Sequence, residues 1–233
     1  MITERNVVMS ELLIKKVEQY QTPKDSPEAA YPTTASVALE LGSIAMRFSR
    51  VERVPRYDEK TRESDVEHSY MLALVASELA HSLYPNELDS GKIMEYAIVH
   101  DLIELKTGDV ATFQLDEETL LQKEATEHAA LESLLAELPP HTRDLLYNYE
   151  QQADKEARFV RAVDKLLPIV VDILGHGHKV MREDYNVHTP SDLAEAHDSL
   201  RTRMTDRFNE FPQIVQDHSL LCELFEIDFS STH

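Results

Sequence analysis

The segment HDLIELKTGDVAT, His100 to Thr112, places a histidine beside an aspartate in an otherwise apolar stretch of the chain. Two further acids, Glu104 and Asp109, follow this pair. Burying an ionised side chain without a partner costs several kcal/mol, so a folded chain rarely does so. We therefore expect His100 and Asp101 to meet other polar groups, or a cation, inside the protein.

The region around this pair has the periodicity of a helix. We expect this helix to begin after Ser90 and to end at Gly108, because glycine commonly follows the last residue of a helix. His100 and Glu104 are four residues apart, so the helix would present them on one face. Alone, Glu104 would be a solvated helix residue; beside His100 it becomes a candidate general acid or base.

A second inward-pointing histidine lies on the preceding helix. Ser64 and Glu67 form the S-x-x-E pattern of a capping box, which predicts a helix start there and a stop at Pro85. His68 lies one turn before Leu72 on the apolar stripe of this helix, so its ring should point inward. By itself, such a histidine is more often a hydrogen-bonded core residue than a metal ligand.

An aspartate is placed in a similar way in DKEARFVRAVDKLLPIVVDIL, residues 154–174, which we expect to be helical. Asp164 stands among apolar residues of this helix. Pro168 cannot donate the hydrogen bond that would return to the carbonyl oxygen of Asp164, which predicts a kink or break. Asp164 could form a buried ion pair with Arg161 or Lys165, or it could bind a cation.

Helical periodicity extends over most of the remaining chain, and strand signals are weak, so we expect an all-α fold. Residues 21–34, rich in proline and polar residues, predict a loop, and the charged residues 50–63 predict a second, ordered loop. Further helical segments are expected at 35–49, 117–138, 140–151, 192–211 and 213–225.

The composition excludes several classes of protein. The 233-residue chain has a formal net charge of −20, which would repel a nucleic-acid polymer unless basic residues gathered on one face, and the sequence shows no such cluster. No apolar run reaches the roughly 18 residues of a transmembrane helix. The single cysteine, Cys222, cannot form an internal disulfide, and the N-terminus has no signal-peptide pattern, so we expect a cytoplasmic protein.

Three helices thus each contribute an inward-pointing group that can ligate a metal: His68, the pair His100 and Asp101, and Asp164. Imidazole and carboxylate ligands suit one divalent first-row ion such as Co, Mn, Ni, Fe or Zn. Ligands on separate helices of a bundle can converge on one ion. The order His…His-Asp…Asp resembles that of the HD-domain metal-dependent phosphohydrolase superfamily.

Within that superfamily, the sequence resembles the YfbR-type 5′-deoxynucleotidases. Three segments carry the likeness: RVPRYDEKTRESDVEHS from Arg53, the HDLIELKTGDVAT block, and NYEQQADKEARFVRAVDKL from Asn148. The likeness covers about Ser43 to Val171. It departs from the family at Val54, where tryptophan is frequent, and at Ala111, where proline is common, so the preferred substrate stays open.

The resemblance implies an HD-domain helical bundle and assigns roles to seven residues. One divalent ion would be held by His68, His100, Asp101 and Asp164. Glu104 would act as general acid or base, Arg53 would bind the phosphate, and Asp109 would recognise a sugar hydroxyl. Without the family, Arg53 could be a surface ion-pair residue and Asp109 a cap of the next turn.

Three functions remain in view at this point. The first is removal of phosphate from (deoxy)nucleoside 5′-monophosphates. The second is a deoxynucleoside triphosphate triphosphohydrolase, and the third is a non-catalytic helical protein that senses a ligand or acts as a scaffold. We expect a small nucleotide as partner, no nucleic-acid polymer, no membrane, and a homodimer by family likeness.

The expected organisation has three parts. Residues 1–34 form an N-terminal extension and loop, residues 35–177 the HD phosphohydrolase core, and residues 178–233 a C-terminal helical extension packed on the core. The extension beyond about Gly177 lies outside the family likeness, and its sequence indicates no chemistry of its own.

Overall fold

A computed structural model describes residues 34–109, 113, 126 and 129–231. The chain divides into two compact units, with the boundary after Phe48. The described part of the first unit is helix α2, Thr34–Phe48, which confirms the helix expected at 35–49. All that follows concerns the second unit.

The second unit begins with a hairpin of two antiparallel strands, β1 (Glu52–Arg56) and β2 (Arg62–Ser64), in which Glu52 pairs with Ser64. The prediction of a loop at 50–63 was therefore wrong. The turn closes because the Asp58 carboxylate accepts hydrogen bonds from the backbone N–H groups of Lys60 and Thr61, at 2.7 and 2.8 Å. The rest of the regular structure described is helical, so the all-α class is confirmed.

Helix α3 (Asp65–Leu83) follows the hairpin directly and packs along α4 (Ser90–Val99). The predicted capping box is present: the Ser64 hydroxyl accepts from the Glu67 N–H, and the Glu67 carboxylate accepts from the Ser64 N–H. Small buried side chains at Ala76, Ala80 and Ala97 let the two helices approach closely. This pairing brings the start of α3 beside the end of α4.

The expected helix from Ser90 to Gly108 is interrupted. Helix α4 ends at Val99, and a separate short helix, α5, spans Glu104–Thr107. Between them, the backbone makes i to i+3 hydrogen bonds, such as Leu102 N–H to Val99 carbonyl (3.1 Å) and Glu104 N–H to Asp101 carbonyl (2.9 Å). The chain thus tightens to a 3₁₀-like turn at the His-Asp pair, a geometry common where helices are interrupted for function.

Three helices continue the bundle: α7 (Pro140–Glu150), α8 (Lys155–Asp164) and α9 (Leu167–Leu174). The break expected near Pro168 is confirmed, because α8 ends at Asp164 and α9 starts with proline in its first turn. Proline suits that position, where an N–H group has no helical partner. Asp164 therefore lies at the C-terminal end of a helix.

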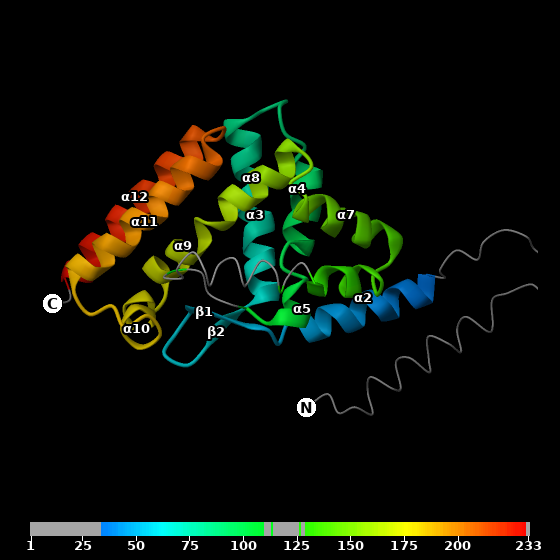
Figure 1. Cartoon of the computed structure of the whole chain (residues 1–233), viewed down its shortest axis with the longest axis horizontal. Helices are drawn as coiled ribbons and strands as arrows, with labels where there is room; N and C mark the ends of the chain where they lie inside the picture. Colours follow the sequence, from blue (N-terminus) through cyan, green and yellow to red (C-terminus); the bar gives the residue numbers. More distant parts are fainter. Residues whose placement is uncertain (1–33, 110–112, 114–125, 127–128, 232–233) are drawn as a thin grey trace, which may run out of the picture. The chain divides into compact units, whose positions relative to one another are not determined.

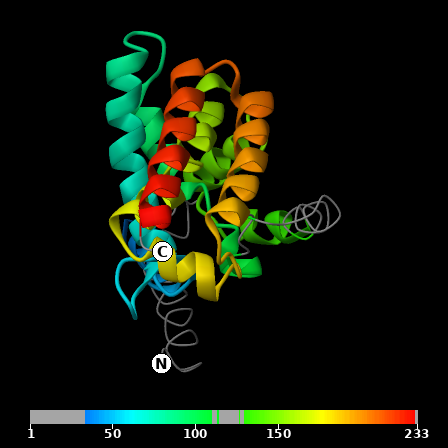
Figure 2. The same ribbon diagram turned by 90° about the vertical axis from the view of Figure 1, so that its left-hand side faces the viewer.

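The chain ends with α10 (Gly177–Glu183) and a long helical pair, α11 (Pro190–Phe208) and α12 (Pro212–Ser231). Figures 1 and 2 show α11 and α12 side by side and antiparallel, and both helices contact α8, while α12 also contacts α9. The two expected amphipathic segments at 192–211 and 213–225 are thus confirmed as helices. Figure 1 shows that this pair lies on the same side of the bundle as α9 and α10.

Two predictions are only partly covered by the structure. Half of the helix expected at 117–138 lies outside the described residues. Of the residues in this range that the structure describes, 126 and 129–135 are helical. The three-part division at residues 34 and 177 stays a prediction. Among the helices that the structure describes, none is long and apolar enough to cross a lipid bilayer.

Candidate metal centre

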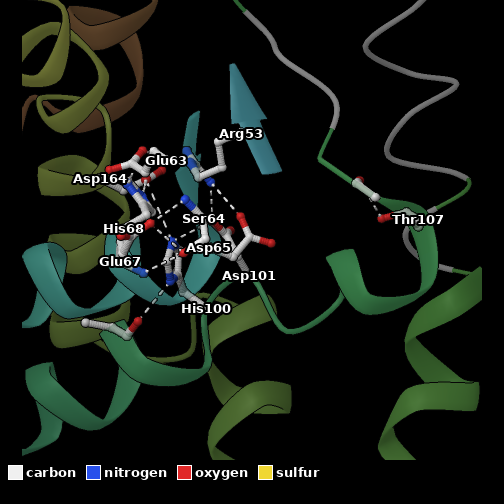
Figure 3. A network of polar contacts seen from close by, with 12 residues as sticks. Arg53, Glu63, Ser64, Asp65, Glu67, His68, His100, Asp101, Thr107 and Asp164 are labelled. Atoms are coloured by element: carbon white, nitrogen blue, oxygen red, sulfur yellow. Dashed lines mark hydrogen bonds and ion pairs between the residues drawn. The ribbon is translucent and has the colours of Figure 1, made fainter. Parts of the chain in front are cut away.

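Three elements bring the four predicted metal ligands together. His68 comes from the first turn of α3, His100 and Asp101 from the turn after α4, and Asp164 from the end of α8. One ligand atom from each of the four residues lies within 4.8 Å of the others. Figure 3 shows their side chains pointing toward one another.

The orientation of His100 is that of a metal-binding imidazole. Its Nδ1–H donates to the Ala97 carbonyl oxygen at 2.9 Å, which leaves the lone pair on Nε2. Nε2 is buried and makes no hydrogen bond to any described residue, although the Asp101 Oδ2 atom is 2.8 Å away. An imidazole nitrogen and a carboxylate oxygen that face one another in this way could both ligate a divalent cation.

His68 and Asp164 complete the set. His68 Nε2 lies 2.9 Å from Asp164 Oδ1, and the same oxygen lies 3.8 Å from His100 Nε2. All of the ligand residues except Asp101 are buried, and Asp101 is half-buried. Two imidazoles and two carboxylates at this spacing fit a divalent metal ion, which confirms that the His/Asp cluster can bind one.

A carboxylate that was not predicted from the sequence lies behind His68. Glu63 is fully buried, and its Oε2 atom lies 3.5 Å from His68 Nδ1, on the ring nitrogen away from Asp164. The Tyr57 hydroxyl donates to the other carboxylate oxygen of Glu63 at 3.2 Å. A carboxylate in this place holds the ring of a metal-binding histidine in orientation and increases its basicity. Only the hairpin brings Glu63 there, so no spacing rule in the sequence indicated it.

Glu63→Gln should therefore weaken metal binding by about 10-fold to 100-fold, because the amide keeps the shape but removes the charge that supports the His68 ring. The readout is the dissociation constant for Mn²⁺, measured by titration calorimetry on protein first stripped with a chelator. Glu67→Gln is the matched control, since glutamine still forms a capping box. Equal affinities in Glu63→Gln and the control would show that Glu63 has no such role.

Glu104 lies in a second cluster of carboxylates beside the ligands. One oxygen each from Asp65, Asp101 and Glu104 lies within 4.8 Å of the others, and Glu104 is only 6% exposed. Without a metal ion, burial and then the charge of Asp101 raise the pKa of Glu104. Burial also acts to raise the pKa of Asp101, but His100 and Arg53 hold it below its ordinary value. A divalent ion bound here would lower the pKa of Glu104, so this carboxyl group can hold or release a proton.

Arg53 reaches into the acidic cluster from β1. Its Nη1 lies 2.8 Å from Asp101 Oδ2 and 3.5 Å from Asp65 Oδ1, and its Nε lies 3.3 Å from Glu63 Oε2. Burial opposes the charge of the guanidinium, but nearby acids raise the pKa of Arg53 above its ordinary value, Asp101 first and then Asp164, Asp109 and Glu104. The sequence had allowed Arg53 an ion-pair role at the surface, but these ion pairs are with buried or half-buried acids. Phosphate binding by Arg53 stays a prediction.

A cavity of about 500 Å³ opens over the cluster. His100, Asp101, Asp164, Glu104, Asp109 and Arg53 all line it. Asp109 follows Gly108, whose φ of 71° turns the chain after α5 in a conformation that favours glycine. Six of the seven predicted site residues therefore share one cavity, and the seventh, His68, lies buried behind it.

Comparison with known proteins agrees with the metal-binding geometry of this site. A family model described as an HD domain matches residues 47–208. The chain belongs to the HD-domain family. Within the match lie all four candidate ligands of this HD-domain protein, so the resemblance inferred from the His…His-Asp…Asp order is confirmed at family level.

Two curated relatives of this HD-domain protein are named 5′-deoxynucleotidase HDDC2. The human protein is 30% identical over 176 residues, which cover 72% of this chain and 77% of the relative. The Xenopus laevis protein is 30% identical over 146 residues, or 59% and 70% of the two chains. A crystal structure of a predicted metal-dependent phosphohydrolase from Magnetospirillum magnetotacticum MS-1 shares the fold, with a TM-score of 0.60, 21% identity, and coverage of 83% of this chain and 95% of that one.

Proposed function

We propose that this HD-domain protein is a metal-dependent phosphohydrolase that removes the 5′-phosphate from (deoxy)nucleoside monophosphates. The observation that carries the proposal is the joint lining of the cavity. The His/Asp cluster shares it with five basic side chains, Arg53, Arg161, Lys165, Arg203 and Arg207. The same lining holds six acids, Asp101, Glu104, Asp109, Glu150, Asp164 and Asp172. The five cations and a bound divalent ion would together outweigh these acids, which favours a small anionic substrate there in a chain of net charge −20.

The relatives support the substrate class. Both the human and the Xenopus laevis proteins are named 5′-deoxynucleotidases, and each match covers more than two thirds of the relative. A cavity of about 500 Å³ lies within the range of roughly 300–1,000 Å³ that is usual for small-molecule sites. A nucleoside monophosphate is of suitable size, whereas the acidic surface disfavours a nucleic-acid polymer.

Each of the seven candidate site residues would have a role in this reaction. His68, His100, Asp101 and Asp164 would hold one divalent ion, which when bound supplies Lewis-acid activation of the phosphoryl group and of water. The Arg53 guanidinium would donate to phosphate oxygens, for which its planar fork is suited. Glu104 would accept a proton from the attacking water or give one to the leaving 5′ oxygen. Asp109 would accept a hydrogen bond from a sugar hydroxyl.

Three finer points belong to the same proposal. The metal is one of Co, Mn, Ni, Fe or Zn, since two histidines and two aspartates suit each of them. The protein is a homodimer, as the family likeness implies. It works in the cytoplasm, which the lack of disulfide-forming cysteines in the sequence favours.

A panel of deoxynucleoside mono- and triphosphates, each with several divalent metals, tests the proposal. Orthophosphate released from a monophosphate supports it. Tripolyphosphate released from a triphosphate would instead identify a triphosphohydrolase. That alternative stays open because position 54 is valine, where the nucleotidases often have tryptophan. No bound metal and no hydrolysis with added Mn²⁺ or Co²⁺ would favour a non-catalytic sensor or scaffold.

Arg53→Ala should raise KM for a monophosphate by about 10-fold or more, because the phosphate loses a charged donor, and should leave the metal in place, since Arg53 is not a ligand. It should also lower stability by about 3 kcal/mol, because Glu63 and Asp65, both fully buried, lose a charged partner. Steady-state kinetics, metal analysis and denaturant unfolding measure the three effects.

The control is Arg143→Ala, which removes an exposed arginine whose only ion pair with a described residue is to its neighbour Asp144. Arg53→Lys separates charge from shape, because lysine keeps the charge but lacks the fork. Unchanged kcat and KM in Arg53→Ala would reduce Arg53 to a structural counter-ion of the acidic cluster.

A further inference from the structure

A buried carboxyl group in the cavity wall takes no part in the mechanism above. Asp172, on α9, is 7% exposed and lines the same cavity as the metal ligands. Its Oδ1 atom makes no hydrogen bond to any side chain or backbone group that the structure describes. Leaving such an atom buried and unpaired is unfavourable, and a bound ligand that hydrogen-bonds to it would remove that penalty.

The cavity wall that Asp172 belongs to is otherwise mainly apolar. Ile169, Val180 and Met181 are buried there, and Val54, Phe113 and Tyr185 pack against them in the same hydrophobic cluster. All six of these residues line the cavity, and we call them the apolar wall. Four of them come from α9 or from the chain after it. The sequence had indicated no chemistry for the part of this region beyond Gly177.

The apolar wall presents aromatic surface. The rings of Phe113 and Tyr185 lie 4.6 Å apart between centroids and are inclined at 41°. Flat heteroaromatic rings stack on such surfaces, as bases do on aromatic side chains in single-strand complexes. The cavity thus combines an anion-binding part, around the metal ligands and Arg53, with an aromatic, apolar part that contains one orphan carboxyl group.

The protonation of Asp172 suits recognition of a base. Burial, together with the charge of Glu63, raises the pKa of Asp172 to about 8. At neutral pH the group is therefore mostly a carboxylic acid, with one O–H donor beside one acceptor. That pair is complementary to the amide or amidine edge of a nucleobase, which also presents a donor beside an acceptor.

We propose that Asp172 and the apolar wall form the nucleobase subsite of this enzyme, in which Asp172 hydrogen-bonds to the polar edge of a base that packs on Tyr185 and Phe113. The inference rests on the proposed function, since it names the group that the nucleoside end of the substrate would meet. It makes Asp172 a specificity-determining residue rather than a catalytic one.

The test compares nucleotides with a substrate that lacks a base. For each protein, kcat/KM is measured for the four common deoxynucleoside monophosphates and for 2-deoxyribose 5-phosphate. Wild type should prefer at least one nucleotide over the sugar phosphate, and Asp172→Leu should reduce that preference by about 10-fold or more, as loss of a buried hydrogen-bonded pair does. Turnover of the sugar phosphate and the metal content should not change.

Two variants control for folding and charge. Asp172→Asn supplies a donor and an acceptor as the carboxylic acid does, so it should keep most of the base preference. This variant also provides a test of the subsite if Asp172→Leu does not fold. Asp206→Leu makes the same change at an exposed position of α11 outside the cavity lining and should behave as wild type. A thermal melt of each protein confirms that it is folded.

The outcomes separate this inference from the proposed function. If wild type hydrolyses nucleotides and Asp172→Leu keeps the full base preference, Asp172 is a structural residue and the subsite is wrong. If wild type hydrolyses no nucleotide, the proposed function fails, and titration calorimetry with unphosphorylated deoxynucleosides decides the subsite. Binding by wild type that Asp172→Leu loses would uphold it, and absence of binding by wild type would overturn it.

Discussion

Asp101→Ala should lose its metal and, with it, phosphohydrolase activity. Asp101 Oδ2 faces His100 Nε2 at 2.8 Å, at the centre of the four-residue ligand set. Its removal deletes a ligand and also the 2.8 Å ion-pair partner of Arg53, whose guanidinium would then keep only its longer contacts with Glu63 and Asp65. The loss in metal affinity should therefore exceed the roughly 100-fold upper limit that is typical of an outer-shell partner.

Elemental analysis of the purified variant measures this effect directly, and kcat on a deoxynucleoside monophosphate measures its consequence. Asp144→Ala is a suitable control, because Asp144 is an exposed aspartate on α7 whose only ion pair with a described residue is to Arg143. Metal content near that of wild type would remove Asp101 from the ligand set.

Glu104→Ala should separate metal binding from catalysis. Glu104 stands outside the four-ligand set but within 4.8 Å of a carboxylate oxygen of Asp101, and it lines the cavity. If it transfers a proton in the reaction, its loss should lower kcat by about 10²-fold to 10⁴-fold while metal and substrate still bind. Glu104→Gln keeps the shape of this buried side chain and should show the same loss with less effect on folding.

The measurement is kcat and metal content on the same sample, with Glu132→Gln as a control at an exposed helical position. A nucleotide should bind to Glu104→Ala without being hydrolysed, which makes this variant suitable for capturing the complex. Near-normal turnover would remove Glu104 from the mechanism. Loss of metal would instead identify it as a ligand.

The features that the sequence predicted correctly depend on neighbours in the chain. The capping box at Ser64 and Glu67 needs only residues three apart, and Pro168 ends the hydrogen bonding of α8 because it lacks an N–H group. The four candidate metal ligands were predicted because their order along the chain matches a known family, and the structure brings one potential ligand atom of each within 4.8 Å of the others. Their role as ligands, like those of Glu104, Arg53 and Asp109, awaits the experiments above.

Other features depend on contacts between distant segments, and there local patterns failed. A helix through His100 fits the periodicity, but the chain breaks to a 3₁₀-like turn at the point where it meets α3 and α8. Residues 50–63 lack the alternation of a strand, and they pair because the turn at Asp58 and the start of α3 hold their ends. That hairpin carries Arg53 and Glu63 to the ligands.

By itself, the sequence therefore determined the helical class, the family and the set of chemical groups at the centre, because composition, capping and ligand order are properties of the chain. Only the tertiary structure decided what surrounds those groups. Glu63 meets His68, Arg53 meets Asp101, and Asp172 enters the same cavity as the ligands because α9 and the hairpin pack beside α3. Burial and charge act through space rather than along the chain, so the partners of each buried group followed from packing alone.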